Sequence, residues 1–175
     1  MRRVHGVLAG AAFVAGVAVG IAATAGGKVD PGMYKGKDPK EAARALLPAA
    51  LAQAGKGSWE TIAVGRVYYL TGDKAEGQAL FDRVIKGKPA ESDWMRLGRV
   101  YLEANEWDKA RDAFDKAAAL DPKDAGNLVE VGGWYNLHGD RAKAEELFDQ
   151  AFKRKADDVW CTVNAAGSYV GVKPQ

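Results

Sequence analysis

The sequence is poor in the residues that most often carry metal and redox chemistry. Its 175 residues include one cysteine and two histidines. A single cysteine excludes an internal disulfide framework and a thiolate-rich zinc or iron–sulfur site. The two histidines do not form a pair with the spacing of metal ligands. The sequence therefore predicts no metal site and no cofactor.

The chain also lacks an excess of charge of either sign. Its 25 Lys and Arg residues oppose 23 Asp and Glu residues, so the formal net charge is +2. Nucleic-acid binding needs a strongly basic face, and we therefore expect no nucleic-acid partner. A charged content of 27% excludes a polytopic membrane protein, and a hydrophobic content of 47% is too high for a disordered chain. The length fits one domain.

Catalytic motifs are missing as well. The sequence has neither a G-x-S-x-G nucleophile elbow nor a G-x-x-x-x-G-K-[ST] phosphate loop. His138 stands beside Gly139 and Asp140 in a predicted turn, which is typical of a helix end. Cys161 has no identifiable acid–base partner, so we interpret it as a packing residue. We expect no enzymatic activity.

Residues 1–25 differ in composition from the rest of the chain. Arg2 and Arg3 are followed by an uncharged run over residues 7–25, and Ala23-Thr24-Ala25 offers the small residues that signal peptidase accepts. This layout predicts a secretory signal peptide that is cleaved before Gly26. The alternative is an uncleaved membrane anchor, because residues 7–25 span about 28 Å as a helix.

Both alternatives place the rest of the chain outside the cytoplasm, because Arg2 and Arg3 hold the N-terminus inside. Cleavage gives a periplasmic or secreted protein, and retention gives a domain anchored to the inner membrane; contact with membrane is expected only through residues 7–25. The style of the leader indicates a bacterial envelope protein. Residues 1–25 hold two basic residues and no acidic one, so the remainder carries 23 of each.

A linker and a first helix are predicted next. Residues 26–37 are rich in Gly and Lys and read as a flexible linker. Asp38 is suited to cap a helix that has Pro39 at its first position and Glu41 three residues after the cap. The helix over residues 41–54 is rich in Ala and Leu, and we expect Pro48 to kink or split it.

Beyond Gly57 the sequence repeats itself at an offset of 33 and then of 34 residues. Several residue types coincide at these offsets: Gly65, Gly98 and Gly132; Tyr68, Tyr101 and Tyr135; Phe81, Phe114 and Phe148. Apolar residues recur at steps of three and four, which predicts two helices in each unit. The first helices are expected at 59–70, 91–104 and 125–137, the second at 74–85, 108–120 and 141–154, and a terminal helix at 159–172. Gly72 and Gly139 are suited to leave the first helices in a left-handed conformation.

The middle unit, residues 91–124, resembles a tetratricopeptide repeat. Eight residues carry the resemblance: Trp94, Leu97, Gly98, Tyr101, Ala110, Phe114, Ala117 and Pro122. Residues 58–90 and 125–158 match less completely, and Gly77 stands where the pattern has alanine. Ala43, Leu47 and Ala50 are placed like the second helix of a degenerate upstream unit. The resemblance implies an all-α domain over residues 38–175, a right-handed superhelical stack of antiparallel helical hairpins with about three repeats and a half-repeat at each end.

The resemblance also implies a function in protein–protein interaction. In this family the first helices line a concave groove that holds a peptide or a helix of another protein. In register, the groove residues are Trp59, Ile62, Arg66, Tyr69, Met95, Arg96, Arg99, Leu102, Val129, Glu130, Asn136 and Asn164, with Trp160 and Val163 beside Asn164.

Two arginines stand in register on successive first helices. Arg66 and Arg99 are suited to bind a carboxylate with two parallel hydrogen bonds. The alternative is that they form solvated helix surface or pair with acids such as Glu60 and Glu103. The equivalent position of the third unit is Gly133.

The end of the sequence offers a second surface. Residues 159–172 carry no charge and include Trp160, Val163, Tyr169 and Val170. Terminal repeats usually have a polar outer face, so this apolar helix predicts a homo-oligomer or docking onto a partner. Two functions therefore stay open. One is an exported scaffold or adaptor that binds an envelope protein in its groove; the other is a structural subunit of a specific envelope complex that docks through the terminal helix.

Overall fold

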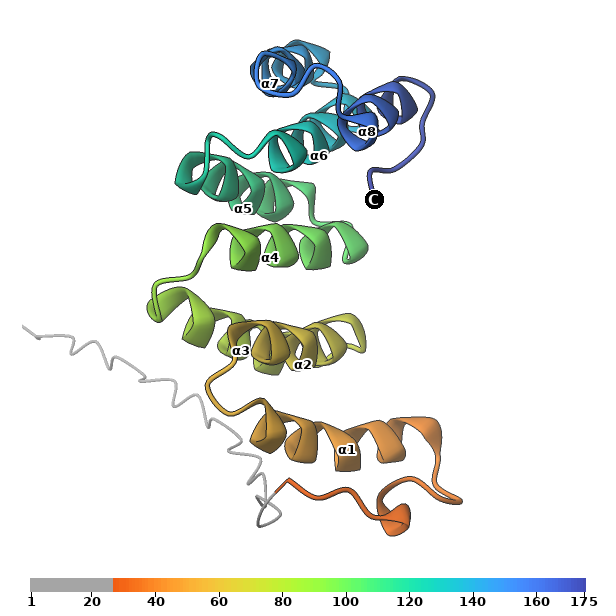
Figure 1. The fold of residues 1–175 in the computed structure, drawn as a ribbon. Coiled ribbons are helices and arrows are strands. Elements are labelled where there is room, and N and C mark those ends of the chain that lie inside the picture. Colours follow the sequence, from red (N-terminus) through yellow and green to blue (C-terminus); the bar gives the residue numbers. More distant parts are fainter. Residues whose placement is uncertain (1–26) are drawn as a thin grey trace, which may run out of the picture.

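The computed structural model describes residues 27–175, which form eight α-helices and one short 3-10 helix (Figure 1). The leader predicted at residues 1–25 lies outside the described residues. The elements are η1 (Pro31–Met33), α1 (Pro39–Ala54), α2 (Ser58–Leu70), α3 (Lys74–Lys86), α4 (Glu91–Glu103), α5 (Trp107–Leu120), α6 (Ala125–Leu137), α7 (Arg141–Phe152) and α8 (Val159–Tyr169).

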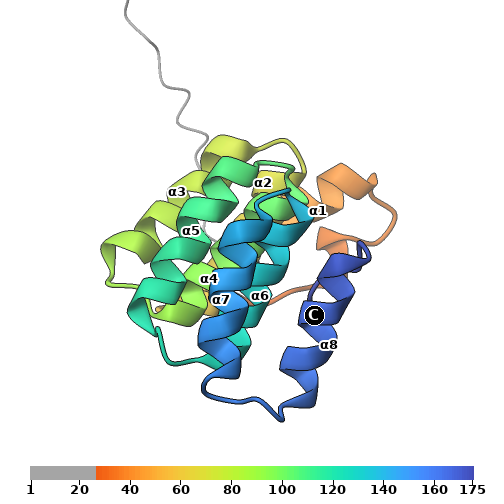
Figure 2. The same cartoon turned by 90° about the horizontal axis from the view of Figure 1, so that it is seen from above.

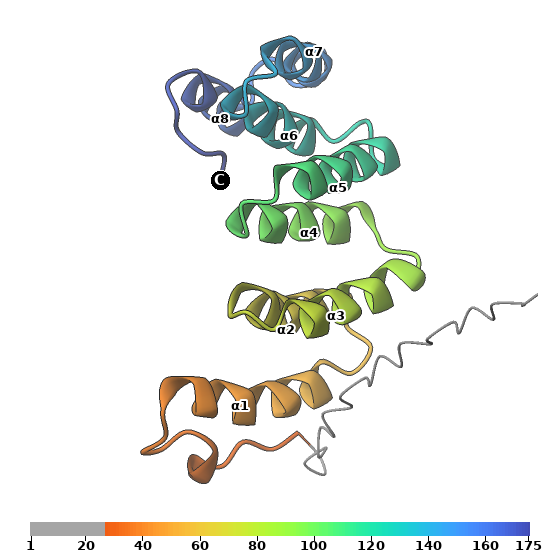
Figure 3. The same ribbon diagram turned by 180° about the vertical axis from the view of Figure 1, so that it is seen from behind.

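The helices pack pairwise as antiparallel hairpins, α2 with α3, α4 with α5 and α6 with α7. The predicted all-α stack of hairpins is thereby confirmed, and each of these six helices begins and ends within two residues of its predicted bounds. The second helices α3, α5 and α7 lie along one side of the stack, and α2, α4 and α6 lie toward the other, where α8 is also found (Figure 2). The view from behind shows the same order (Figure 3).

One contact recurs inside every hairpin and explains the repeated Gly and Phe. The rings of Phe81, Phe114 and Phe148 are buried against the first helix of their own unit. A Cβ atom added to Gly98 would lie 2.4 Å from Cε1 of Phe114, and the corresponding distances to Phe81 from Gly65 and to Phe148 from Gly132 are 2.6 and 2.7 Å. Glycine therefore recurs because the phenylalanine ring lies directly on the helix backbone.

The turns inside the hairpins use left-handed residues as predicted. Gly72 has φ +106° and Gly139 has φ +92°, and Asn105 takes the same role in the middle unit with φ +58°. After α6, the amide of Asp140 donates to the carbonyl of Tyr135 over 3.0 Å, which closes the helix end. Asparagine tolerates this backbone conformation better than most residues, so the middle unit needs no glycine there.

The first helix begins as predicted but does not break where expected. Asp38 accepts a hydrogen bond from the amide of Lys40 over 2.9 Å, and Pro39 is the first helical residue. The expected split at Pro48 is wrong, since α1 runs through Pro48 to Ala54 as one helix. Leu47 beside it is buried with Val64 and Tyr68 of α2, and this packing compensates for the hydrogen bond that a proline cannot donate.

The segment before α1 is folded rather than a flexible linker. Residues 31–33 form a 3-10 turn that Asp30 caps by accepting from the amide of Gly32 over 2.7 Å. Gly27 is buried, and its carbonyl accepts a hydrogen bond from the side chain of Gln53 in α1. These contacts attach the segment to the outer end of the stack.

The core is continuous from α2 to α8, whereas α1 joins through a separate small cluster on α2. The terminal helix α8 packs far more extensively on α6 than on α7. Its Cys161 and Ala165 are buried in the main core, as expected for a packing cysteine. Leu128, Val129 and Val131 of α6 are almost completely buried because α6 has neighbours on several sides.

Candidate functional site

The predicted groove residues divide sharply by exposure. Ile62, Tyr69, Met95 and Val129 are buried, each 2% exposed or less. These four side chains were expected to contact a partner, but they are buried in the core and are not accessible to one. The accessible remainder, which we call the first-helix face, consists of Trp59, Arg66, Arg96, Arg99, Leu102, Asn136 and Asn164, with the largely buried Glu130 beside them.

Ion pairs join successive first helices across this face. Arg66 of α2 donates from Nε to Glu103 of α4 over 2.7 Å. Arg99 of α4 binds Glu130 of α6 with two parallel bonds, Nε to Oε1 at 2.6 Å and Nη2 to Oε2 at 2.5 Å. The pairing alternative for Arg66 and Glu103 is thereby confirmed. Arg99 is paired to Glu130, so two residues that the sequence predicts to bind a partner bind each other instead.

The two pairs differ in their access to solvent. The side chains of Arg66 and Glu103 are 48% and 41% exposed, so water surrounds this pair. The Glu130 side chain is only 9% exposed, and the hydrogen bonds with its carboxylate raise the pKa of the Arg99 guanidinium. The two arginines are similarly exposed, Arg99 at 46% and Arg66 at 48%, so the pairs differ in the carboxylate, which is largely buried in Glu130 and open to solvent in Glu103.

A third arginine of the first-helix face stacks on an aromatic ring near the start of α2. The guanidinium carbon of Arg96 in α4 lies 3.7 Å from the ring centroid of Trp59 in α2. Trp59 is still 49% exposed, so the indole is held in a defined orientation and remains accessible. The register of the repeat gave no sign of this contact, because it joins positions that are not equivalent in the two units.

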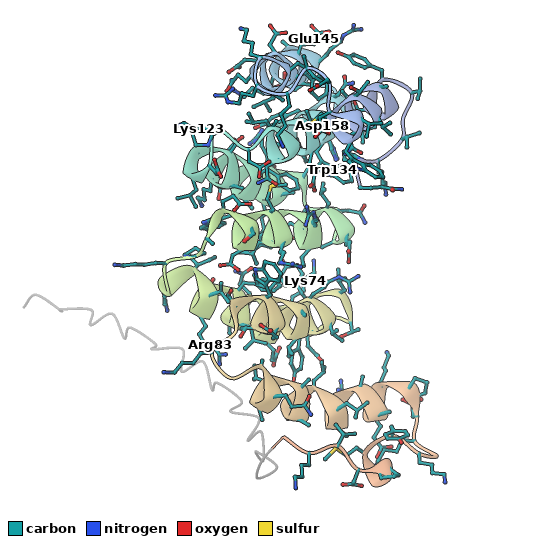
Figure 4. The ribbon with its side chains drawn as sticks, in the orientation of Figure 1. Lys74, Arg83, Lys123, Trp134, Glu145 and Asp158 are labelled. Atoms are coloured by element: carbon teal, nitrogen blue, oxygen red, sulfur yellow. The ribbon has the colours of Figure 1, made fainter. Side chains whose placement is uncertain are left out.

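A polar network joins the α2–α3 hairpin to the α4–α5 hairpin. Glu106 accepts hydrogen bonds from the Tyr69 hydroxyl at 2.6 Å and from Lys74 Nζ at 2.6 Å, and it pairs with Lys109 at 2.8 Å. Lys74 reaches into the space between the α2–α3 hairpin and α4 (Figure 4). Partial burial raises the pKa of Glu106, but the hydrogen bonds from Lys109, Lys74 and Tyr69 outweigh it and lower the pKa to about 2. Tyr69 thus serves the junction between units.

The second predicted surface is exposed as expected. On α8 and just after it, Trp160 is 69%, Val163 54%, Tyr169 46% and Val170 78% exposed. Tyr169 also contacts the stack, since its ring lies 6.0 Å from that of Phe148 and the guanidinium of Arg141 lies 5.1 Å from its centroid. The free apolar surface of this end therefore includes Trp160, Val163 and Val170, together with Val159 and Val172, which are 63% and 56% exposed.

A cavity of about 540 Å³ lies where the start of α2, the end of α3 and the start of α4 meet. Arg83 lines it and donates to Thr61 Oγ1 over 3.0 Å. Asp93 is 4% exposed and accepts from the amide of Ala90 through Oδ2, while its Oδ1 has no hydrogen-bond partner within residues 27–175. The cavity mixes cationic and anionic groups and shows no arrangement typical of a catalytic centre.

The middle hairpin matches a known protein family. Residues 92–124 match the family described as Tetratricopeptide repeat. They are a tetratricopeptide repeat. This match covers α4, α5 and the turn between them, and the hairpins on either side pack as a tetratricopeptide stack does. No curated protein matches the chain significantly.

The tetratricopeptide repeat implies a protein–protein interaction module. No group of His, Cys, Asp and Glu able to hold a metal ion occurs within residues 27–175. In the same part of the chain, no helix is both long and apolar enough to cross a bilayer.

Proposed function

We propose that the protein is an exported tetratricopeptide scaffold that binds an acidic peptide or helix of another envelope protein on its first-helix face. The observation that carries this proposal is the stacking of Arg96 of α4 on Trp59 of α2, with Arg66 seven residues after Trp59 on α2. These side chains combine an accessible indole with two guanidinium groups on adjacent helices. Aromatic and arginine side chains are the residues that most often dominate binding at protein interfaces.

The pairing of Arg66 does not prevent it from binding a partner. An ion pair between exposed side chains contributes only about 0–1 kcal/mol, so a carboxylate on a partner can replace Glu103 at little cost. The bidentate pair of Arg99 and the mostly buried Glu130 is a different case, because opening it leaves Glu130 without its counter-charge. We therefore assign partner recognition to Arg66 and a structural role to Arg99.

Site-specific crosslinking tests this assignment. A photo-reactive residue in place of Ala63, an exposed residue of α2 between Trp59 and Arg66, in cells that express the full chain, is expected to capture one defined envelope protein. Adding Arg66→Glu is expected to abolish that crosslink by charge reversal, whereas Arg111→Glu is expected to preserve it. Arg111 is a matched control, since it is an exposed arginine on α5 that pairs only with Asp108 of its own helix. A crosslink that survives Arg66→Glu contradicts the proposal.

A second candidate function rests on the exposed apolar side chains of α8. We propose as the alternative that Trp160, Val163 and Val170 dock the protein into a specific envelope complex or onto a second copy. Sedimentation velocity over a wide concentration range distinguishes docking into a complex from association with a second copy. A monomer at every concentration that associates only with a co-purified partner supports the complex, and a dimer that Trp160→Asp dissociates supports self-association.

Export and the lack of catalysis belong to the same proposal. Support for export comes from the sequence of residues 1–25, and a non-catalytic role is supported by the tetratricopeptide repeat and by the absence of a catalytic motif in the sequence. N-terminal sequencing of the protein from fractionated bacteria is expected to begin at Gly26 if the leader is cleaved and at residue 1 if it anchors. Recovery from the cytoplasmic fraction contradicts export.

A further inference from the structure

The segment after α8 turns back onto the stack. Gly171 has φ +83°, and the amide of Val172 donates to the carbonyl of Gly167 over 2.9 Å, which reverses the chain at the end of the helix. The amide of Gln175 then donates to Oδ1 of Asn164 in α8 over 3.3 Å. Figure 1 shows the segment turning back from the end of α8, with the C-terminus below that helix.

Two glycines on different helices make room for the side chains of this segment. A Cβ atom on Gly133 of α6 would lie 2.7 Å from Cγ of Pro174, and one on Gly167 of α8 would lie 3.3 Å from Cβ of Val172. Gly133 is buried under this cover. Gly133 is equivalent in the repeat to Arg66 and Arg99 of the two preceding units. The third unit thus has a proline ring from elsewhere in the chain where the others have an arginine side chain.

Hydrogen bonds join α6 to α8 beneath this segment. The side chain of Asn136 in α6 donates to Ser168 Oγ in α8 over 3.0 Å, and Ser168 in turn donates to the carbonyl of Ala165. Ser168 lies beside Gly133, with its Cβ 3.6 Å from the position that a Cβ would take there. Asn136 and Asn164, both predicted to bind a partner, are therefore engaged with α8 and with the segment that follows it.

We propose that residues 172–175 are an intramolecular ligand of α6 and α8, with the ring of Pro174 bound on Gly133. This bound segment closes the first-helix face at the third unit and leaves it open over α2 and α4. A partner that extends onto α6 must displace it. The docking of the segment does not depend on which partner the open part of the face binds.

Backbone NMR relaxation of the full chain tests the proposal. In the wild type the amide of Gln175 is expected to be ordered, with an order parameter close to the value of about 0.85 found in rigid backbone. Gly133→Ala places a methyl group against Pro174, so the order parameter of Gln175 is expected to fall below about 0.6, as in flexible segments. Gly126→Ala in the same helix is the control, because a Cβ there meets only Asp124 Oδ1 at 3.3 Å.

A second variant keeps the test independent of changes in α6. Pro174→Ala leaves the helices unaltered, and it is expected to mobilise Gln175 and to shift the amide resonance of Gly133. A Gln175 amide that is flexible in the wild type, or that stays ordered in both Gly133→Ala and Pro174→Ala, overturns the proposal. Order at Gln175 that appears only at high protein concentration assigns the segment to a second copy and overturns it as well.

Discussion

Replacing Gly77 by alanine is expected to destabilise the protein, although alanine is the residue that the repeat has at this position. Ala110 and Ala144 occupy the equivalent place in the next two units and are completely buried. Substitution toward the residue typical of a repeat usually stabilises. The structure predicts the opposite here, because a Cβ on Gly77 would lie 2.7 Å from the carbonyl oxygen of Gly65 and 2.7 Å from the amide nitrogen of Tyr69.

The magnitude follows from two opposing effects. Alanine is favoured over glycine inside a helix by about 1 kcal/mol. Overpacking a well-packed site costs about 1–3 kcal/mol, and the upper end applies because both crowded atoms belong to the backbone of α2 and cannot rotate away. The net destabilisation is about 2 kcal/mol, which lowers the melting temperature of a chain of this size by roughly 4–8 °C.

Thermal unfolding followed by far-UV circular dichroism measures this effect. Gly126→Ala serves as the reference, since Gly126 is an exposed helical glycine where the added methyl group meets little. We expect Gly126→Ala to melt at or above the wild-type temperature and Gly77→Ala below it. A Gly77→Ala protein that is as stable as the wild type refutes the close approach of α2 and α3 described above.

Three further predictions concern charges and the thiol. Arg99→Met is expected to cost about 1–3 kcal/mol in urea unfolding, because it leaves the carboxylate of Glu130 without a partner, whereas Arg66→Met costs less than about 1 kcal/mol; equal costs contradict the distinction between the two pairs. The pKa of Glu106 is lower in the folded chain (about 2) than its ordinary value of 4.5, so this group contributes stability above pH 4.5 that is lost as the pH falls toward 2. Acid titration of the unfolding free energy is therefore expected to be shallower in Glu106→Gln, and an unchanged slope speaks against the network. Burial raises the pKa of the Cys161 thiol, so its reaction with a disulfide reagent is expected to be slow in the folded chain and fast in denaturing urea; fast reaction of the folded chain contradicts the packing role.

The sequence was sufficient to predict the hairpins because their determinants are local and repeated. Gly98 and Phe114 form a contact within one unit, and the same pair of residue types recurs at offsets of 33 and 34. Gly72 and Gly139 end their helices through their own backbone conformation. Features of this kind depend on residues of a single hairpin, so they can be predicted without knowledge of the rest of the fold.

What the sequence did not predict depends on how the units are placed against one another. The repeat register gives the face of a helix on which Tyr69 lies, but its burial depends on Glu106 and Lys109 of the next unit. The split expected at Pro48 ignored the packing of Leu47 on α2. Gly133 stood out only as a departure from arginine, and its reason lies in Pro174, 41 residues further along the sequence. No local pattern encodes such a contact.

The separate attachment of α1 has a consequence for how the molecule comes apart. Leu47 of α1 meets Val64 and Tyr68 on one side of α2, while the continuous core begins with other residues of that helix, such as Ile62. Detaching α1 therefore exposes few apolar side chains and leaves the remaining hairpins packed. Its amide protons are expected to exchange with solvent through a local opening well below the free energy of global unfolding, whereas those of α6 exchange only when the whole stack opens. Under tension applied from its N-terminal side, the stack yields first at α1.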